Sequence, residues 1–447
     1  MARKKKIIEE INVIPQQILQ KPIGEVSRDC FLDFGNYINN QRHTAGFDGC
    51  KPSYRRLIFA SLQFPKGKLI PSTTVISSVA NYHPHSLTGI ELLNSNLVHT
   101  GVFSGEGSWG YTEISGVYSP YAAPRYTKQR ISDTYLNVFG DLWREVPMIE
   151  SPIAGSMEIS YLPLPLPLCL YMKSSVTGLG IGIKSDYPNF SPVSLYKAYI
   201  NNDPSLLEPN ANLFIDKSKS ELDKLWKTGK GKITYSFKLE RAVDNMGNPG
   251  VLFKGDTFLF TPNLRKFRQL AAEGKVYMED ITDIYGPKLI ISKIPGARGI
   301  TIEKIEDLAS KCCFDSSTYT TNVTTGSTTF RIPLYDWLDY TYKNYIDLIT
   351  KVNIKKIDKV TFDISVLEVL PIISDYIINK NPKATDEELS KVLNIPMEII
   401  NSVMSKPISY LRKNKDTSSR IKELKEKLKE LKKFDPIKYT ENIINQL

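Results

Sequence analysis

Tyr126 carries the most chemical interest in this sequence, because it stands between Arg125 and the hydroxyl residue Thr127. A phenol has a pKa of about 10, so at neutral pH it becomes a good nucleophile only where cations favour the phenolate or a base takes its proton. Arg125 supplies such a cation. Taken alone, the stretch Pro120–Ser132 favours a tyrosine whose ring packs on a core while its hydroxyl reaches water or a carbonyl. The residues upstream are needed to choose between these two interpretations.

Basic residues gather upstream, at the start of a predicted helix. Asp48-Gly49 is a turn signal, and Pro52 suits the first helical position because its missing N–H would have no partner there. Around this first turn lie Lys51, Arg55 and Arg56. Cations there oppose the helix dipole, which favours a bound anion such as phosphate. The alternative is an ordinary solvated face.

Two of the four histidines in the chain, His83 and His85, flank Pro84 in a corner between two predicted short helices. Ser72 and Ser86 are the predicted N-caps of these helices. Two capped helices joined by a tight corner have the shape of a helix-turn-helix. The gathering of histidines favours proton handling or contact with phosphate. A metal site is not indicated, because the spacing suits a turn and no third ligand is in view.

The composition bounds the class of protein. A chain of 447 residues is too long for one hydrophobic core and suggests roughly two to four domains. Its net charge of +10 and pI of about 9.0 favour an anionic partner, such as nucleic acid or a membrane surface. No apolar run is long enough to span a bilayer, and the basic start has no apolar signal core. The five cysteines show neither zinc nor disulfide spacing. We therefore expect a cytoplasmic protein with reduced thiols.

Periodicity and breaker residues predict the elements around these motifs. Residues 1–25 are predicted to be an arm whose basic tip, Lys4–Lys6, is a solvated tail, and Ser27–Asn40 has the apolar spacing of a helix. Between about 185 and 330 the pattern predicts a helix over Pro204–Trp226. It also predicts strands over Lys232–Lys238, Val251–Phe260 and Lys288–Pro295, and a hairpin over 316–330 that turns at Gly326.

The C-terminal part is predicted to be helical. Tyr335–Val352 has helical apolar spacing, and an a/d series follows at Ile421, Leu424, Leu428 and Leu431. The two patterns predict an antiparallel coiled coil with a globular tip at about 366–411 between its arms. The apolar residues of the tip serve either its own core or a partner surface, and a plain helical hairpin is the alternative.

At this point a series of motifs resembles the DNA-cleaving subunit of type IIA topoisomerases, in which they read DGLKPxxRR, YHPHG, GNFG and AAxRYT. The glycine strand Thr177–Ser191 and the proline-rich Leu162–Cys169 resemble segments that follow in that family. The residues that match are, in order, Arg42, Asp48-Gly49-Cys50-Lys51-Pro52-Ser53-Tyr54-Arg55-Arg56, Tyr82-His83-Pro84-His85, Gly107-Ser108-Trp109-Gly110 and Ala122-Ala123-Pro124-Arg125-Tyr126-Thr127.

The resemblance implies roles for these residues. Tyr126 would attack a DNA phosphorus and form a 5′-phosphotyrosyl bond, and Arg125 would stabilise the charge of the transition state. Arg42, whose spacing from Asp48 is one residue shorter than in the family, would be a second cation or proton-acceptor partner of the phenol, and His85 would contact the scissile phosphate. The implied DNA-binding residues are Lys51, Arg55, Arg56, His83, Ser86 (a glycine in the family), Thr88 and Leu179, the last as a wedge between base pairs.

The resemblance also implies an α+β multidomain fold. It consists of a winged-helix (helix-turn-helix) domain over 26–150, a mixed α/β tower-like domain that bends DNA over 151–330, and an antiparallel coiled coil with a helical dimer gate over 331–447. The partners would be double-stranded DNA and a second copy of the chain. A lysine-rich but otherwise ordinary α/β domain is the alternative for the middle region.

Some features of the family are missing from the sequence. It contains no acidic DxD cluster and no Walker loop, so Mg²⁺ and ATP are expected to bind a separate ATPase/metal-binding subunit. The chain ends soon after the coiled coil. It most resembles the medium subunit of the split type II topoisomerase of T-even-like bacteriophages, which implies a role in phage DNA replication in the host cytoplasm.

Two other functions stay open. A non-catalytic helix-turn-helix dimer would bind DNA without cutting it. A phosphatase or nuclease that used the histidines would leave hydrolysed ends and would not need Tyr126.

Overall fold

The computed structural model describes residues 21–110, 120–172, 176–210, 213–254, 261–281, 288–296, 300–326, 328–405 and 417–447. The predictions for Lys4–Lys6, for most of the arm 1–25 and for the end of the tip at 406–411 lie outside these residues. In the described part of the chain, no helix is long and apolar enough to cross a membrane.

The first compact unit combines three short helices with a three-stranded antiparallel sheet of order β1-β3-β2. Its elements and the helix before them are α1 (Ile23–Ile38), the π-helical turn η1 (Asn39–His43), α2 (Pro52–Leu62), β1 (Ile70–Pro71), α3 (Ser72–Val79), α4 (Leu87–His99), β2 (Phe103–Glu106), the 3-10 turn η2 (Pro124–Tyr126), β3 (Lys128–Ile131), α5 (Asp133–Phe139) and the 3-10 turn η3 (Leu142–Glu145).

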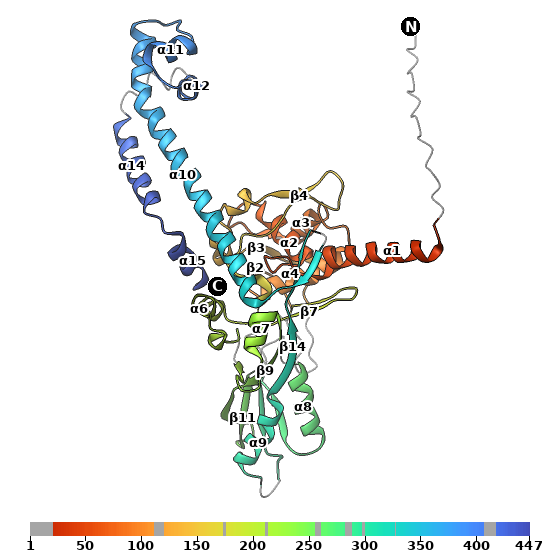
Figure 1. The fold of residues 1–447 in the computed structure, drawn as a ribbon. Helices are drawn as coiled ribbons and strands as arrows, with labels where there is room; N and C mark the ends of the chain where they lie inside the picture. The colour runs from red at the N-terminus through yellow and green to blue at the C-terminus, as the bar shows by residue number, and fades with distance from the viewer. Residues whose placement is uncertain are drawn as a thin grey trace, which may run out of the picture.

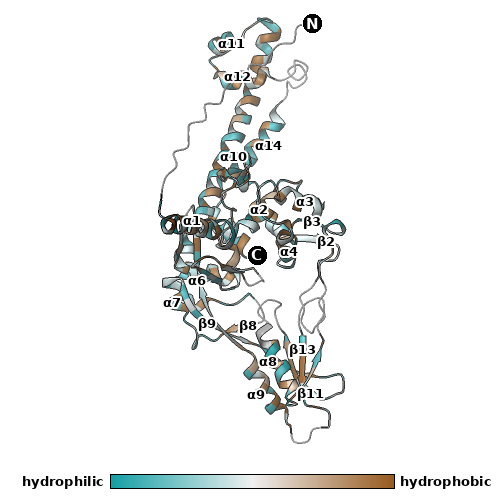
Figure 2. Cartoon of the chain, turned by 90° about the vertical axis from the view of Figure 1, so that its right-hand side faces the viewer, coloured by the Kyte–Doolittle hydropathy of each residue, from teal (hydrophilic) through white to brown (hydrophobic). Residues whose placement is uncertain are grey.

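The helix starts in this unit follow local chemistry. Pro52 is the first residue of α2, and the Ser86 hydroxyl accepts a hydrogen bond from the Thr88 N–H at the start of α4, both as predicted. Ser72 is the first residue of α3 and not its cap, because Pro71 holds that position. The apolar side chains of α2, α3 and α4 are largely buried, and the three helices contact one another; Figure 2 shows them grouped together.

Helix α1 differs from these helices, because it projects from the body of the protein (Figure 1) and Gly35 is its one buried residue. Its apolar side chains face solvent. Those more than half exposed are Ile23, Phe31, Leu32 and Phe34.

The middle of the chain is built on antiparallel sheets. The strands are β4 (Met148–Glu150), β5 (Met157–Ile159), β6 (Val176–Leu179), β7 (Lys184–Tyr187), β8 (Leu213–Ile215), β9 (Lys230–Phe237), β10 (Leu239–Val243), β11 (Pro249–Lys254), β12 (Tyr277–Asp280), β13 (Lys288–Ser292), β14 (Phe314–Thr320), β15 (Asn322–Thr325) and β16 (Thr328–Arg331). The helices and 3-10 turns are η4 (Leu168–Leu170), α6 (Pro192–Asn201), η5 (Pro204–Leu206), α7 (Leu222–Thr228), α8 (Thr261–Ala272) and α9 (Ile302–Cys312).

Strand order in the two larger sheets is β6-β7-β14-β9-β8 and β10-β11-β13-β12, and β4-β5 and β15-β16 are separate hairpins. The strands predicted near β9 and β13 are confirmed, and so is a turn at Gly326. Residues 255–260 of the predicted strand Val251–Phe260 lie outside the described part. The helix predicted over Pro204–Trp226 is wrong, because strand β8 lies inside that range and pairs with β9, and helix α7 begins only at Leu222.

The C-terminal part consists of α10 (Leu334–Asn379), α11 (Asp386–Leu393), α12 (Met397–Met404), α14 (Ser418–Lys432) and α15 (Pro436–Ile444). Helices α10 and α14 lie side by side (Figure 1) and run antiparallel, since Thr417 bonds the Leu367 carbonyl while Asn353 bonds the Leu431 carbonyl. The predicted a/d series is confirmed at this seam, where Ile421, Leu424, Leu428 and Leu431 pack on α10.

The tip has a small core of its own, in which Val366, Leu370 and Ile373 pack against residues of α11 and α12. The tip is not separate from the coil, however. Helix α10 has 46 residues and continues past Val366 and through Pro371, so its last turns form one wall of the tip.

Candidate functional site

Tyr126 lies at the end of the 3-10 turn η2, which leads into the central strand β3. The Thr127 hydroxyl donates to the Ser72 hydroxyl at 2.8 Å, and the Ser72 N–H donates to the Thr127 carbonyl at 3.0 Å. These bonds tie the turn to the first residue of α3. The Tyr126 side chain points outward and is 66% exposed, so the interpretation of a ring packed on a core is wrong.

Arg125 stands beside the phenol. The central carbon of its guanidinium lies 4.6 Å from the centroid of the Tyr126 ring, a cation–π arrangement. Arg125 is exposed, and within the described residues it makes no ion pair with a carboxylate. A guanidinium in this state is available to an incoming phosphate oxygen.

Gly107 explains how the turn is held so close to strand β2. Its backbone has a φ of +103°, and a side chain there would place its first carbon 2.8 Å from the Tyr126 carbonyl oxygen. Next to it, the Ser108 carbonyl accepts a hydrogen bond from the Ala122 N–H at 2.9 Å. The Trp109 carbonyl in turn accepts the Ser95 hydroxyl of α4 at 2.8 Å. The glycine-rich motif therefore links α4 to the Tyr126 turn.

Five of the other predicted site residues line an open cavity of about 380 Å³ between η1, α2 and α4. Its walls include Arg42, Lys51, His83, His85 and Ser86, and we call it the basic groove. Other side chains in its walls are Gln41, Ser53, Tyr54, Ile90, Leu92, Leu93 and Asn96. Neither Tyr126 nor Arg125 lines it. One copy of the chain thus brings these five residues together but does not place the predicted nucleophile among them.

The two groove histidines are uncharged at neutral pH. Burial and the neighbouring positive charge of Arg56, with smaller effects of His85 and Arg42, lower the pKa of His83 from 6.5 to about 4. The pKa of His85 is also lowered, by burial and by Arg42 and Arg56. The His85 Nε2 lies 3.3 Å from the Tyr37 hydroxyl. In this state the histidines can offer an N–H to phosphate but not a full positive charge.

Lys51 links the groove to the glycine strand, because its ammonium donates to the Thr177 carbonyl of β6. Burial lowers the pKa of Lys51. At the end of β6 the Leu179 side chain is 71% exposed. The hairpin turn beyond it is held by Asn39, whose amide oxygen accepts the Ile181 N–H at 2.8 Å. Thr88 is exposed on the first turn of α4.

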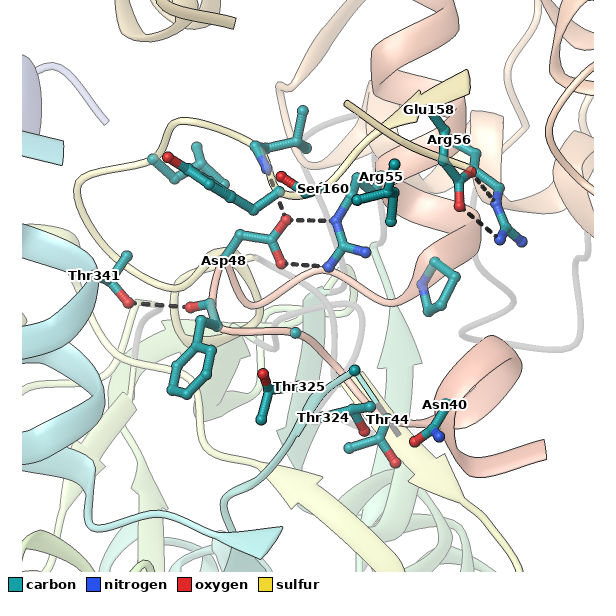
Figure 3. Close-up of a pocket in the computed structure, with 18 of the residues that line it drawn as sticks. Asn40, Thr44, Asp48, Arg55, Arg56, Glu158, Ser160, Thr324, Thr325 and Thr341 are labelled. Carbon is teal, nitrogen blue, oxygen red and sulfur yellow. Dashed lines mark hydrogen bonds and ion pairs between the residues drawn. The ribbon is translucent and has the colours of Figure 1, made fainter. Parts of the chain in front are cut away.

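Arg55 and Arg56 do not occupy the positions predicted for DNA contacts. Arg55 donates twice to Asp48, at 2.8 Å each, and its side chain is 15% exposed. Arg56 donates to Glu158 at 2.6 and 3.0 Å, and its side chain is 2% exposed. Figure 3 shows both pairs at the wall of a second cavity of about 350 Å³. Both guanidinium groups are thus bound by carboxylates inside the protein, and neither residue lines the basic groove.

Sequence reasoning missed several residues near the groove. Glu158 and Gln41 hold Arg56, and Tyr37 contacts His85. No local pattern marks Glu158, which lies 102 residues from Arg56 in the chain. No group of three or more His, Cys, Asp or Glu residues in the described ranges could hold a metal ion.

With this geometry in view, comparisons with known proteins are informative. The sequence profile of the DNA gyrase/topoisomerase IV family, specifically of its A subunits, matches residues 45–257. This part of the chain is therefore similar to the A subunits of that family. The matched residues include Tyr126, Arg125 and the groove residues from Lys51 onward, whereas Arg42 lies just before them.

A curated relative points to the same family. The chain is 23% identical to the DNA gyrase A subunit of Clostridium acetobutylicum over 261 residues. That alignment covers 53% of this chain and 30% of the gyrase protein. The chain thus spans less than a third of the length of this relative.

Proposed function

We propose that this chain is the DNA breakage-reunion subunit of an ATP-dependent type II topoisomerase. Tyr126 forms a transient 5′-phosphotyrosyl bond in a double-strand break, and another duplex passes through the break, so that DNA is relaxed or decatenated. One observation carries the proposal: within residues matched to the family, an exposed phenol stands on an anchored turn with a guanidinium at its face.

The chemistry balances without hydrolysis. The Tyr126 oxygen forms a bond to phosphorus, the bond from phosphorus to the 3′-oxygen breaks, and the phenolic proton leaves as the 3′-oxygen gains one. Arg125 can leave the ring face and donate two parallel N–H bonds to the nonbridging oxygens, whose charge grows in the transition state. Reversal reseals the strand because the ester energy is kept.

The basic groove supplies phosphate contacts that position DNA without reading its sequence. Arg42 is exposed at the rim, and His85 and His83 offer neutral N–H donors. The N–H groups at the start of α4, next to Ser86 and Thr88, add a positive helix end. Arg55 and Arg56 are left out of this contact set, because Asp48 and Glu158 already bind them.

We assign the remaining domains by the same proposal. Helices α3 and α4 with the β1-β3-β2 sheet act as the winged-helix unit, the two larger sheets with α8 and α9 act as the tower that bends DNA, and the tip of α10 acts as a dimer gate. The exposed Leu179 fits a wedge between base pairs, since 71% of its side chain is free of protein contact.

The site needs further chains. Because Tyr126 lies outside the basic groove of its own copy, a homodimer would let the groove of one copy approach the phenol of the other. We propose that a separate ATPase/metal-binding subunit holds Mg²⁺ and ATP. The exposed apolar face of α1 supports contact with another chain. The chain would then correspond to the medium subunit of a T-even-like phage enzyme, acting in DNA replication in the host cytoplasm.

The separation of Tyr126 from the groove also favours a second candidate, a helix-turn-helix dimer that binds DNA without cutting it. A covalent assay separates the two. The protein is mixed with its ATPase/metal-binding subunit, supercoiled DNA, Mg²⁺ and ATP, and the reaction is stopped with detergent. We expect protein attached to 5′ ends, lost in Tyr126→Phe and kept in Tyr340→Phe, a tyrosine that is 50% exposed elsewhere. Absence of attached protein in the wild type would favour the second candidate.

A further inference from the structure

Arg56 connects the interior of the protein to the basic groove. Its Nε and Nη2 donate to the two oxygens of Glu158 at 2.6 and 3.0 Å, and Nη2 also donates to the Gln41 side chain at 2.9 Å. Figure 3 shows how Glu158, on strand β5, faces the guanidinium. The third nitrogen, Nη1, lies 3.4 Å from Nδ1 of His83.

This geometry determines which nitrogen of His83 carries the proton. A guanidinium has five N–H donors and no acceptor, and it stays protonated in proteins. The Nδ1 that faces it must therefore present its lone pair. In a neutral imidazole the proton then lies on Nε2, on the other edge of the ring, and His83 is one of the residues that line the groove.

The charges around His83 favour the neutral ring. Arg56 and Arg42 are the cations that lower its pKa. The centroid of the His85 ring lies 5.2 Å from that of the His83 ring, and the two rings are nearly perpendicular. Glu158 is the one carboxylate that touches Arg56 in the described part of the chain. It neutralises the guanidinium but reaches His83 only through it. Burial and the cations around it thus keep the ring uncharged, and the contact with Arg56, which Glu158 binds, selects the tautomer.

We propose that Glu158 is a positioning residue that, through Arg56, fixes His83 as the Nε2–H tautomer and so presents a hydrogen-bond donor to phosphate in the basic groove. The step from the tautomer to DNA cleavage rests on the proposed function, whereas the tautomer itself does not. Glu158 is not one of the residues that line the groove, and it acts on the groove through Arg56, which contacts His83 and Gln41.

Nitrogen-15 NMR of the histidine rings in the full chain tests the proposal directly, with the His83 signals identified by their loss in His83→Gln. We expect one neutral tautomer with Nε2 protonated across about pH 6 to 8, the range in which an ordinary histidine titrates. In Glu158→Gln the single tautomer should give way to a mixture. The matched control is Glu306→Gln, which removes a carboxylate that Arg241 holds in the same two-bond geometry at 2.7 and 3.3 Å on the surface.

A second variant covers the case in which Glu158→Gln does not fold. Arg56→Lys keeps a positive charge beside Glu158 but loses the planar fork that reaches Glu158, Gln41 and His83 at once, so it should also give mixed tautomers. A wild-type His83 protonated on Nδ1 would overturn the proposal. So would a single Nε2–H tautomer retained in either folded variant.

The rate of DNA cleavage is a second measurement, and it would not change if Glu158 only stabilised the fold. In the complete complex, Glu158→Gln should lower the rate of DNA cleavage by about 10- to 100-fold, the scale expected for a misplaced contact group. Its DNA affinity and the salt dependence of that affinity should match the control. An equal rate in the folded variant and the control would contradict the role in cleavage. If the wild type itself forms no covalent adduct, the proposed function fails while the NMR result still decides the positioning role.

Discussion

At the scale of single residues, the surroundings of each arginine determine whether its guanidinium is open to an incoming phosphate. Arg125 is exposed beside Tyr126, whereas Arg55 and Arg56 are each held by a carboxylate inside the protein. The sequence predicted one role for all three, namely contact with phosphate. The ion pair of Arg56 could not be predicted from the sequence, because Glu158 lies on a distant strand and no spacing pattern links the two residues.

The Asp48–Arg55 pair should stabilise the fold more than a surface pair does. The buried Asp48 carboxylate also accepts the Cys50 and Leu162 N–H groups at 3.0 and 2.9 Å. Breaking a buried pair from one side leaves an uncompensated charge, so Asp48→Ala should lower the free energy of unfolding by about 3–5 kcal/mol. Urea denaturation measures this. The control Asp133→Ala removes an exposed partner of Arg130 and should leave the midpoint unchanged; equal effects of the two changes would contradict the assignment.

His83 should make stability depend on pH. Its pKa is lowered from 6.5 to about 4 in the folded protein, so between these values the unfolded chain binds more protons than the folded one. Stability must then fall as the pH falls from about 6.5 toward 4. Urea midpoints should decline more steeply over this interval in the wild type than in His83→Gln. Parallel declines would show that His83 titrates normally in the folded state.

At the scale of elements, the positions that fix a backbone turn determine where Tyr126 lies. Gly107 combines a φ of +103° with close approach to the Tyr126 carbonyl, and Thr127 bonds Ser72 from the other side. Both contacts join segments distant in sequence. The sequence motifs identified Gly107 and Tyr126, but the contact between them can be seen only in the folded structure.

Gly107→Ala should therefore displace the Tyr126 turn. A methyl group would overlap the Tyr126 carbonyl, and the positive φ adds strain. We expect covalent attachment to DNA to drop by about 10-fold or more, as for other small misplacements of reacting groups. Gly101→Ala is the matched control, because Gly101 also has a positive φ of +80° but nothing lies within 4 Å of a side chain there. The same loss in both variants would mean that backbone strain and not the contact matters.

Local signals predicted the elements that local chemistry fixes. Pro52 at the start of α2, the Ser86 cap of α4 and the a/d series on α14 all follow from nearby residues. The failures depend on distant pairing. The predicted helix over Pro204–Trp226 is interrupted where β8 pairs with strand β9, and α10, which continues through Pro371, packs against α12 and α14. The surroundings of the groove follow the same rule, since Glu158 reaches Arg56 and Tyr37 reaches His85 from separate segments.

At the scale of the whole molecule, the structure has three hydrophobic cores in different regions. The large core covers the body and the root of α10, a small one lies at the seam with α14, and a third lies in the tip. Each core packs the side chains of its own region, and helix α10 contributes to all three. The tip can therefore act as a contact surface while the body keeps the groove and the Tyr126 turn in place.

The tip should contribute to dimer formation through its exposed apolar residues, among them Val392 at 60% exposure. A charge buried in an interface is costly, so Val392→Glu should weaken the dimer at least 10-fold, measured by sedimentation. Val243→Glu alters a valine of similar exposure, 59%, on strand β10 and should not. An unchanged dimer in Val392→Glu would remove the dimer-gate assignment from this face of the tip.

The central claim is that Tyr126 becomes joined to DNA, and identifying the modified residue tests it most directly. The covalent product from the complete complex is digested with nuclease and protease, and mass spectrometry then identifies the peptide that carries a nucleotide. We predict a nucleotide joined through its 5′-phosphate to Tyr126, with no adduct in Tyr126→Phe. A nucleotide on another residue, or an adduct that persists in Tyr126→Phe, would contradict the account.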